Sequence, residues 1–203
     1  MKKIIFVSLI FMCSHLQAQI NTLTPGQEAP EFELKNVNGK EVGFKNFPDA
    51  KGFILVFTCN TCPVSQAYEE RIKELDKKYA AQGYPVIAIN PNDPELVSDD
   101  SYEKMQQRAK NKAYSFPYLF DKGQVITNRY GAKNTPHAFL IGRQNKGYII
   151  EYAGAIDNDP RDGNSGKTNY MENAIADLQH GKKPALASTK AIGCSVKRKT
   201  SDL

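Results

Sequence analysis

The feature that most constrains this fold is the apolar run Gly52-Phe-Ile-Leu-Val-Phe57, followed almost at once by two cysteines in Thr58-Cys-Asn-Thr-Cys-Pro63. Such a run is typical of a strand covered on both faces, as in the core of a parallel sheet. Residues 63–81 then show helical spacing, and Gly83 is placed to stop the helix. The apolar positions that fall near one face are Val64, Ala67, Tyr68, Ile72, Leu75 and Tyr79. The sequence therefore predicts a buried strand, a Cys-x-x-Cys turn and an amphipathic helix in succession.

The remaining pattern predicts an α/β domain. We expect an N-terminal hairpin of Phe32–Asn36 and Glu41–Phe44 around Asn38-Gly39, because Asn-Gly suits a tight turn. Further expected elements are a buried strand at 84–89, a surface helix at 101–113 after Asp99 and Asp100, a short strand at 116–120, a helix at 124–130, a hairpin of 138–141 and 148–152, and a helix at 169–179. This order is typical of a mixed central sheet with helices on both faces.

The first residues have the layout of a secretory signal peptide. Lys2 and Lys3 precede the apolar run Ile4–Met12, and a polar stretch then ends at the small residue Ala18. The run is shorter than the roughly 20 apolar residues that a spanning helix needs. We therefore expect a signal peptide at 1–18, a domain at 19–181 and a tail at 182–203. The alternatives are a buried N-terminal strand and a lipoprotein anchor at Cys13, although the residues before Cys13 are bulky.

Composition and charge limit the function classes. The chain has 203 residues, which suits one domain, and 40% hydrophobic residues, which is enough for a core. Loss of Lys2 and Lys3 lowers the net charge from +5 to +3, which is too mild to indicate a nucleic-acid partner. We also expect no integral membrane segment in the mature protein.

Cleavage removes Cys13, and an exported protein with Cys59, Cys62 and Cys194 has one pair and one extra thiol.

Cys59 and Cys62 are the candidate catalytic residues. Two thiols separated by two residues form a disulfide with little backbone movement, and at a strand-to-helix junction the helix N-terminus stabilises a thiolate. We predict that Cys59 lies at that N-terminus as the exposed nucleophile with a lowered pKa. Cys62, one turn into the helix, is then the more buried thiol that resolves a mixed disulfide. The alternative is a structural disulfide or two core cysteines.

The segment Phe53–Leu75, the order of the elements and Thr135-Pro136 before the second hairpin resemble the thioredoxin superfamily. The fuller resemblance, over roughly residues 25–196, is to the exported peroxiredoxin-like (redoxin) branch, including its N-terminal hairpin and the ending Thr189–Lys197. It implies a thiol–disulfide oxidoreductase without a cofactor, in which Cys59 attacks and Cys62 resolves. It also implies that Pro136 is cis and lies against the cysteine pair, and that Thr135 offers backbone groups to a bound substrate chain.

Three positions depart from plain thioredoxins and are expected to modulate the redox potential. Thr58 replaces the Trp before the first cysteine, and Asn60 and Thr61 replace Gly-Pro between the cysteines.

A fourth departure concerns proton transfer. Phe53 stands where thioredoxins carry a buried acid, so the usual proton acceptor for the resolving thiol is missing. Glu69, Glu151 or a water molecule are the candidate substitutes, and the sequence does not choose among them.

Two other functions compete with disulfide exchange. A peroxidase would carry Pro-x-x-x-Thr-x-x-Cys, but the Thr position is Val56 if Cys59 is the reactive thiol and Cys59 itself if Cys62 is. The second is metal binding, such as copper delivery, in which Cys59, Cys62 and His137 would converge on one soft ion. We expect no resident metal, because related carriers have three residues between the cysteines. His137 is otherwise expected to lie partly buried near the site or to stabilise the Cys59 thiolate.

Cys194 has three interpretations. It is a third redox thiol that reaches the pair, a residue that links two chains, or an inert remnant. Gly193 before it and the basic residues after it favour an exposed thiolate, so an exposed reactive thiol is preferred.

The expected partners are protein disulfides or dithiols. By family analogy a membrane-embedded redox partner would exchange electrons with the protein, which favours the periplasm over the medium. The direction of electron flow, the substrate and the oligomeric state are not predicted by the sequence.

Overall fold

The structure is a computed structural model that describes residues 21–161, 163 and 165–199. The predicted signal peptide at 1–18 lies outside the described residues. Over the described part of the chain, no helix has the length and apolar character needed to cross a bilayer.

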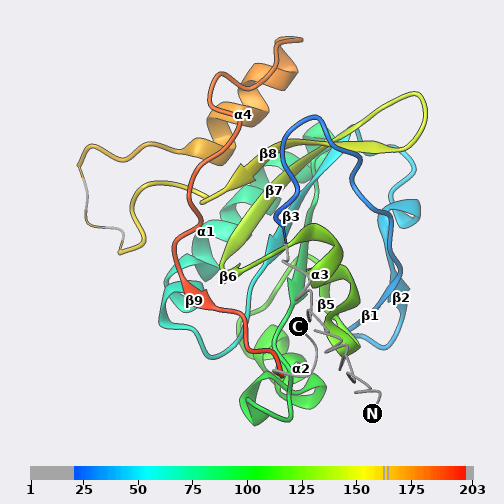
Figure 1. The fold of residues 1–203 in the computed structure, drawn as a ribbon, viewed down its shortest axis with the longest axis vertical. Helices are drawn as coiled ribbons and strands as arrows, with labels where there is room; N and C mark the ends of the chain where they lie inside the picture. The colour runs from blue at the N-terminus through cyan, green and yellow to red at the C-terminus, as the bar shows by residue number, and fades with distance from the viewer. Residues whose placement is uncertain (1–20, 162, 164, 200–203) are drawn as a thin grey trace, which may run out of the picture.

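A seven-stranded mixed sheet forms the centre of the molecule, in the order β2-β1-β5-β4-β3-β7-β8 (Figure 1). The strands are β1 (Leu34–Asn36), β2 (Glu41–Val42), β3 (Gly52–Phe57), β4 (Val86–Asn90), β5 (Tyr118–Phe120), β7 (His137–Arg143) and β8 (Tyr148–Gly154). β3 pairs in parallel with β4 and antiparallel with β7. The predicted mixed sheet is therefore confirmed, with β3 held on both edges.

Both faces of β3 are buried. Ile54 and Val56 contribute to one hydrophobic cluster, whereas Phe53, Leu55 and Phe57 contribute to another on the opposite face. This alternation follows from the period of two in a strand. It confirms the interpretation of the apolar run as a strand covered on both sides.

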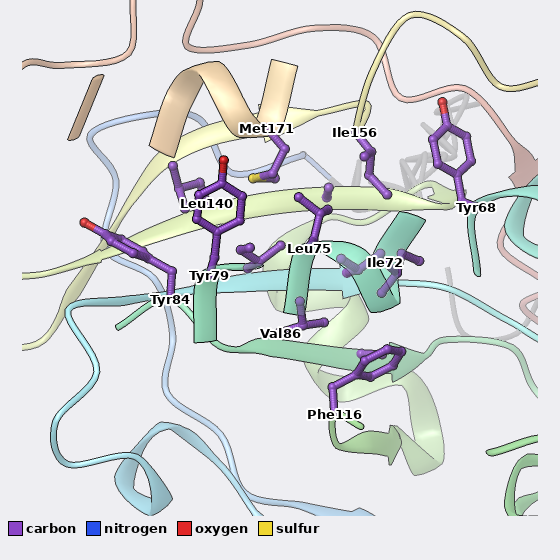
Figure 2. Close-up of a cluster of buried hydrophobic side chains, with 14 of the residues drawn as sticks. Tyr68, Ile72, Leu75, Tyr79, Tyr84, Val86, Phe116, Leu140, Ile156 and Met171 are labelled. Carbon is purple, nitrogen blue, oxygen red and sulfur yellow. The ribbon is translucent and has the colours of Figure 1, made fainter. Parts of the chain in front are cut away.

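Helices α1 (Pro63–Tyr79) and α4 (Tyr170–Gln179) cover one face of the sheet (Figure 1). Figure 2 shows Leu75 from α1 and Met171 from α4 over the strands that carry Val86 and Leu140. α2 (Tyr102–Asn111) adds the fully buried Met105 to this cluster. The predicted helical spacing in 63–81 is confirmed, with a 3-10 turn, η2 (Ala80–Gln82), before Gly83.

The other face is covered by α3 (Val125–Tyr130), which follows the short turn η4 (Lys122–Gln124), and by an aromatic cluster. Phe53 of β3 stacks on Phe44, with ring centroids 4.4 Å apart, and Tyr148 meets the Phe44 ring at 4.7 Å. Helices therefore lie on both faces of the sheet, as predicted.

The N-terminal hairpin is confirmed but is shorter than predicted. Gly39 takes a φ of +85° in its turn, which favours glycine. Phe44 lies in the 3-10 turn η1 (Phe44–Asn46) rather than in a strand, because its ring turns inward onto Phe53.

The C-terminal tail contains a strand that its weak sequence signals do not predict. β9 (Cys194–Ser195) pairs antiparallel with β6 (Asn134–Thr135), so Cys194 lies opposite Thr135. In Figure 1 the tail runs in orange and red from α4 to β9, which lies beside β6. Two-residue strands carry too little periodicity to be predicted from a sequence.

Leu55 and Leu96 test the role of β3 as the centre of the core. Leu55 is fully buried, whereas Leu96 is 51% exposed. Leu55→Ala is expected to lower the free energy of unfolding by about 2–5 kcal/mol, because it leaves a cavity in a packed core. The matched change Leu96→Ala is expected to stay within about 0.5 kcal/mol. Urea denaturation of both variants measures the difference, and equal losses would contradict the assignment.

Candidate functional site

The two motif cysteines follow the carboxyl end of β3, where open α/β sheets place their functional groups. Both are free thiols in this structure. The Cys59 sulfur lies 3.3 Å from Thr135 Oγ1, and the Cys62 sulfur lies 3.1 Å from the Thr135 carbonyl oxygen. The Thr135–Pro136 peptide bond is cis, as the resemblance implied. The structure thus brings together Cys59, Cys62 and the Thr135-Pro136 turn, residues separated by more than 70 positions.

The helix begins at the expected residue, Pro63, but it serves a different cysteine from the one predicted. α1 starts at Pro63 and Cys62 is its N-cap, so Cys62 rather than Cys59 lies at the helix N-terminus. The expectation that Cys62 lies one turn into the helix is wrong. Proline is favoured at the first helical position, so Pro63 was the sequence signal that identified its predecessor as the cap.

Cys62 is the thiol of the pair that ionises more readily. A hydrogen bond from the Cys59 thiol, together with the thiol and N–H of Cys194 and the N–H of Ser65, lowers the pKa of Cys62 to about 4. A helix N-terminus supplies such free N–H groups and favours a thiolate.

Cys59 has the opposite environment. Its hydrogen bond with Cys62, its burial and the nearby carboxylate of Asp100 raise the pKa of Cys59. The side chain is only 5% exposed. The prediction of an exposed Cys59 with a lowered pKa is therefore wrong for the reduced protein. The two thiols titrate as one unit that holds a single proton at neutral pH.

Asp100, which the sequence pattern places only before a helix, organises the loop between the cysteines. It is fully buried and ends the 3-10 turn η3 (Ser98–Asp100). Its carboxylate accepts hydrogen bonds from backbone and side-chain donors at 2.6–3.2 Å: Asn60 N, Thr61 Oγ1, Asn90 Nδ2 and Asn92 Nδ2. A buried carboxylate needs such donors because it has left water. Its position 40 residues from the motif gave no sequence signal.

The other predicted modulators also fix the loop. The Thr58 N–H donates to the Ile89 carbonyl at 2.9 Å, which ties the loop to β4. Asn60 donates from Nδ2 to the Asp99 carbonyl at 2.7 Å and accepts from Tyr118 at 3.0 Å. Thr61 Oγ1 also lies 4.0 Å from the Cys59 sulfur.

Neither candidate for the missing acid lies at the pair. Glu69 is bound by Arg108 at 2.5 Å and accepts a hydrogen bond from Tyr114. Glu151 lies beside Gly142, and Gly142 pairs with Gly52 at the start of β3, the end away from the cysteines. Asp100 is the acid that the structure places next to Cys59.

The His137 side chain lines a cavity that is separate from the cysteine pair. Its ring packs on Phe139 with centroids 4.6 Å apart and lines a separate cavity of about 340 Å³ with residues 22–25 and 188–191. Burial and Lys133 lower the pKa of His137 to about 4, so it is neutral at neutral pH and provides no charge for a thiolate. Among the described residues, no three His, Cys, Asp or Glu side chains are arranged to hold a metal ion. The trio of Cys59, Cys62 and His137 is therefore not assembled as a metal site.

Cys194 is brought to the pair. Its backbone N–H donates to the Cys62 sulfur at 3.4 Å, and its side chain is partly exposed. Burial and the hydrogen bond with Cys62 raise the pKa of Cys194 to about 11. The expectation that the basic residues make it a thiolate is therefore wrong in the reduced protein.

A polar groove of about 530 Å³ opens beside the motif. Asn60, Thr61 and Gln66 line one side, and Lys104 and Arg108 of α2, followed by Lys112, line the other. Asp99 also lines the groove, and Glu69 pairs with Arg108 and Lys112, so the groove is an approach of mixed charge to the Thr61 side of Cys59.

Comparison with known proteins gives a family match. The AhpC/TSA family model matches residues 25–157, more than half of the chain. A curated relative, the thiol-disulfide oxidoreductase ResA of Halalkalibacterium halodurans, is 29% identical over 116 residues, or 57% of this chain and 61% of the relative. The chain thus covers less than two thirds of the length of the first curated relatives that it matches, at 61% and 65%.

Two solved structures extend the comparison. An uncharacterized conserved protein from Geobacillus kaustophilus has a TM-score of 0.80 at 30% identity, over 89% of this chain and 95% of that protein. A Chlorobium tepidum protein, proposed to be the thiol:disulfide interchange protein DsbE, has a TM-score of 0.53 at 23% identity over 64% and 83%. The second likeness concerns the fold alone, which is thioredoxin-like.

The Asp100 network predicts a stability difference between two neighbouring acids. Asp100→Asn leaves at least one buried donor unpaired, which is expected to lower the free energy of unfolding by about 1–3 kcal/mol. The exposed neighbour Asp99 gives a matched control, because Asp99→Asn is expected to change the free energy of unfolding by less than about 0.5 kcal/mol. Thermal or urea unfolding measures both, and a neutral Asp100→Asn would show that the network is dispensable.

The ionisation of the pair predicts a pH profile. Because the pKa of Cys62 is lowered, the reduced protein is expected to keep one thiolate at neutral pH and to lose it as the pH falls through about 4. The ultraviolet absorbance of the thiolate, read as the difference between reduced and oxidised protein, measures this. Cys62→Ser should abolish the acidic transition. A thiolate that appears only near the ordinary pKa of a thiol would refute the assignment.

Proposed function

Because this chain belongs to the AhpC/TSA family, we propose that it is a thiol–disulfide oxidoreductase in which Cys59 and Cys62 alternate between dithiol and disulfide. The observation that carries the proposal is the pair itself, two buried thiols with linked ionisation whose sulfurs both contact Thr135 at a cis-proline bond. The printed name of the curated relatives, thiol-disulfide oxidoreductase, supports it.

The exchange begins with the shared proton. Transfer of the Cys59 proton to Cys62 leaves a thiolate on the sulfur nearer Thr61. That thiolate attacks one sulfur of a substrate disulfide, a Cys59–substrate bond forms, and the other substrate sulfur leaves as a thiolate. Cys62 then gives its proton to that thiolate and attacks the Cys59 sulfur, so the Cys59–substrate bond breaks, the second substrate sulfur leaves as a thiolate and the Cys59–Cys62 disulfide closes. The reverse sequence oxidises a substrate dithiol.

We propose that the substrates are protein disulfides or dithiols, with Thr135 and Pro136 shaping their site. The groove beside Thr61 supports this proposal, because it is open and is lined by polar and charged side chains that can bind a polypeptide next to the reacting cysteine.

We also propose that the protein is exported. The layout of residues 1–18 supports removal of a signal peptide and function in the periplasm. A membrane-embedded redox partner would then reset the pair. This partner rests on analogy with the family and not on a contact in the structure.

Peroxide reduction is the second candidate, and the family match is the observation that favours it. Val56 occupies the position of the peroxidatic Thr in that pattern. Among the described residues, no arginine donates a hydrogen bond to either motif sulfur. Disulfide exchange therefore fits the site better.

A direct competition tests the proposal. The reduced protein receives equal concentrations of peroxide and a disulfide-bonded protein, and loss of the Cys59 thiol is followed by trapping and mass spectrometry. We expect the disulfide to win and a Cys59–Cys62 bridge to appear. Cys59→Ser and Cys62→Ser should each lower substrate reduction by about 100-fold or more, because each removes one step of the exchange. Preference for peroxide by orders of magnitude would make the protein a peroxidase instead.

A further inference from the structure

The tail strand brings a third sulfur to the redox pair. Cys194 lies opposite Thr135 in the β6–β9 ladder, and its N–H donates to the Cys62 sulfur at 3.4 Å. The Cys194 and Cys62 side chains also lie close enough for each to influence the pKa of the other. Cys194 is therefore part of a cluster of three thiols that disulfide exchange through Cys59 and Cys62 leaves unexplained.

Cys62 is the centre of this cluster. The ionisation of Cys59 and that of Cys194 are both linked to Cys62, whose sulfur also accepts the Cys194 N–H. Two of the three side chains are buried, and only Cys194 is partly exposed. The three sulfurs therefore form a path from the buried pair to the surface.

The tail is held in this place by contacts on both sides of Cys194. A side chain at Gly193 would put its Cβ 2.1 Å from the Thr135 carbonyl oxygen, so only glycine lets the strand approach the turn. Hydrogen bonds of 2.6–3.1 Å join the tail to the domain: Asn134 Nδ2 to Gly193 O, Val196 N to Lys133 O, Lys197 N to Asn92 Oδ1 and Arg198 Nη2 to Ala132 O. These contacts fix Cys194 beside Cys62 instead of leaving it on a loose terminus.

We infer that Cys194 is a third redox-active thiol, which exchanges with the Cys59–Cys62 disulfide and carries it to the surface as a Cys62–Cys194 disulfide. The Cys194 thiolate attacks the Cys62 sulfur, the Cys62–Cys194 bond forms, and the Cys59–Cys62 bond breaks. Cys59 leaves with the electron pair and takes up the proton that Cys194 released. The step rests on the proposed function, which supplies the first disulfide, and it needs no other oxidant or reductant.

The charges around Cys194 favour its attack on Cys62 only after the Cys59–Cys62 pair has been oxidised. In the reduced protein the charge on Cys62 helps to raise the pKa of Cys194, which keeps it protonated. Once Cys62 is in a disulfide that charge is gone, while Lys197, which lowers the pKa of Cys194, remains. Oxidation of the pair therefore favours the attacking thiolate.

The position of Cys194 is also that of a substrate cysteine. The resemblance assigns the backbone of Thr135 to a bound substrate chain, and in this structure the tail pairs with it. The tail thus presents its own cysteine to the pair, and a redox partner reaches the partly exposed Cys194 without entering the groove.

Disulfide mapping of the full chain tests the inference. Cys59→Ser is reduced, then equilibrated with oxidised and reduced glutathione, alkylated and digested with trypsin. Cleavage after Lys51, Arg71, Lys190 and Lys197 leaves Cys62 and Cys194 on different peptides, so their bridge joins two peptides. We expect this bridge as the main oxidised product.

The matched control moves the thiol by one residue. Cys59→Ser/Cys194→Ser/Ser195→Cys keeps one tail cysteine, but successive strand residues point to opposite faces. We expect glutathione adducts in place of the bridge and an effective concentration at least about 100-fold lower, because the displaced thiol no longer meets Cys62. Equal bridging by both variants, or adducts alone in Cys59→Ser, would overturn the inference.

The wild-type chain gives a second measurement that does not depend on a variant. Partial oxidation is expected to yield both the single-peptide Cys59–Cys62 bridge and the two-peptide bridge to Cys194. Exclusive formation of the Cys59–Cys62 bridge would overturn the inference while leaving the proposed function intact. Failure of the wild-type protein to exchange with any protein disulfide would refute the proposed function itself.

Discussion

The backbone pairing of β3 on both edges is the constraint on which the site depends. Because β4 and β7 hold β3 in register from Ile54 to Phe57, the chain leaves the sheet at a fixed point, and the cysteines must follow there. The same pairing with β7 brings Thr135 and Pro136, which precede that strand, to the same end of the sheet. The meeting of the motif with its cis-proline turn is thus a consequence of sheet register.

Two fixed charges of opposite sign then distinguish the motif sulfurs. The buried carboxylate of Asp100 lies on the side of Cys59, and the N-terminus of α1 lies at Cys62. A carboxylate disfavours a second negative charge nearby, whereas a helix N-terminus favours one. Two of the four donors that stabilise Asp100 are the backbone N–H of Asn60 and the hydroxyl of Thr61, so Asp100 sets both the charge and the shape of the loop.

Local patterns predicted the elements near the motif, but not the parts that depend on distant contacts. The apolar run 52–57 and the spacing after Pro63 identified β3 and α1, because both signals are contained in neighbouring residues. Asp100 was read only as a helix-start acid, since its role arises from contacts with residues 60 and 61. Cys194 reaches Cys62 through a two-residue strand, and no periodicity marks a strand that short. The ionisation of the pair was assigned to the wrong cysteine, because Cys59 was placed at the helix N-terminus although the expected helix begins at Pro63.

The missing buried acid is explained by packing on the far face of β3. Phe53, at the position of that acid, stacks on Phe44 at 4.4 Å and meets Tyr148 at 5.6 Å, so it joins the N-terminal segment to the sheet. A carboxylate among these rings would be buried without donors, which is costly. The aromatic cluster therefore excludes a carboxylate at position 53. Proton transfer is left to the groups near the sulfurs, which are the other thiols, Thr61 with its partner Asp100, Thr135 and the tail. A third thiol beside Cys62 then provides a proton donor and acceptor in place of the carboxylate.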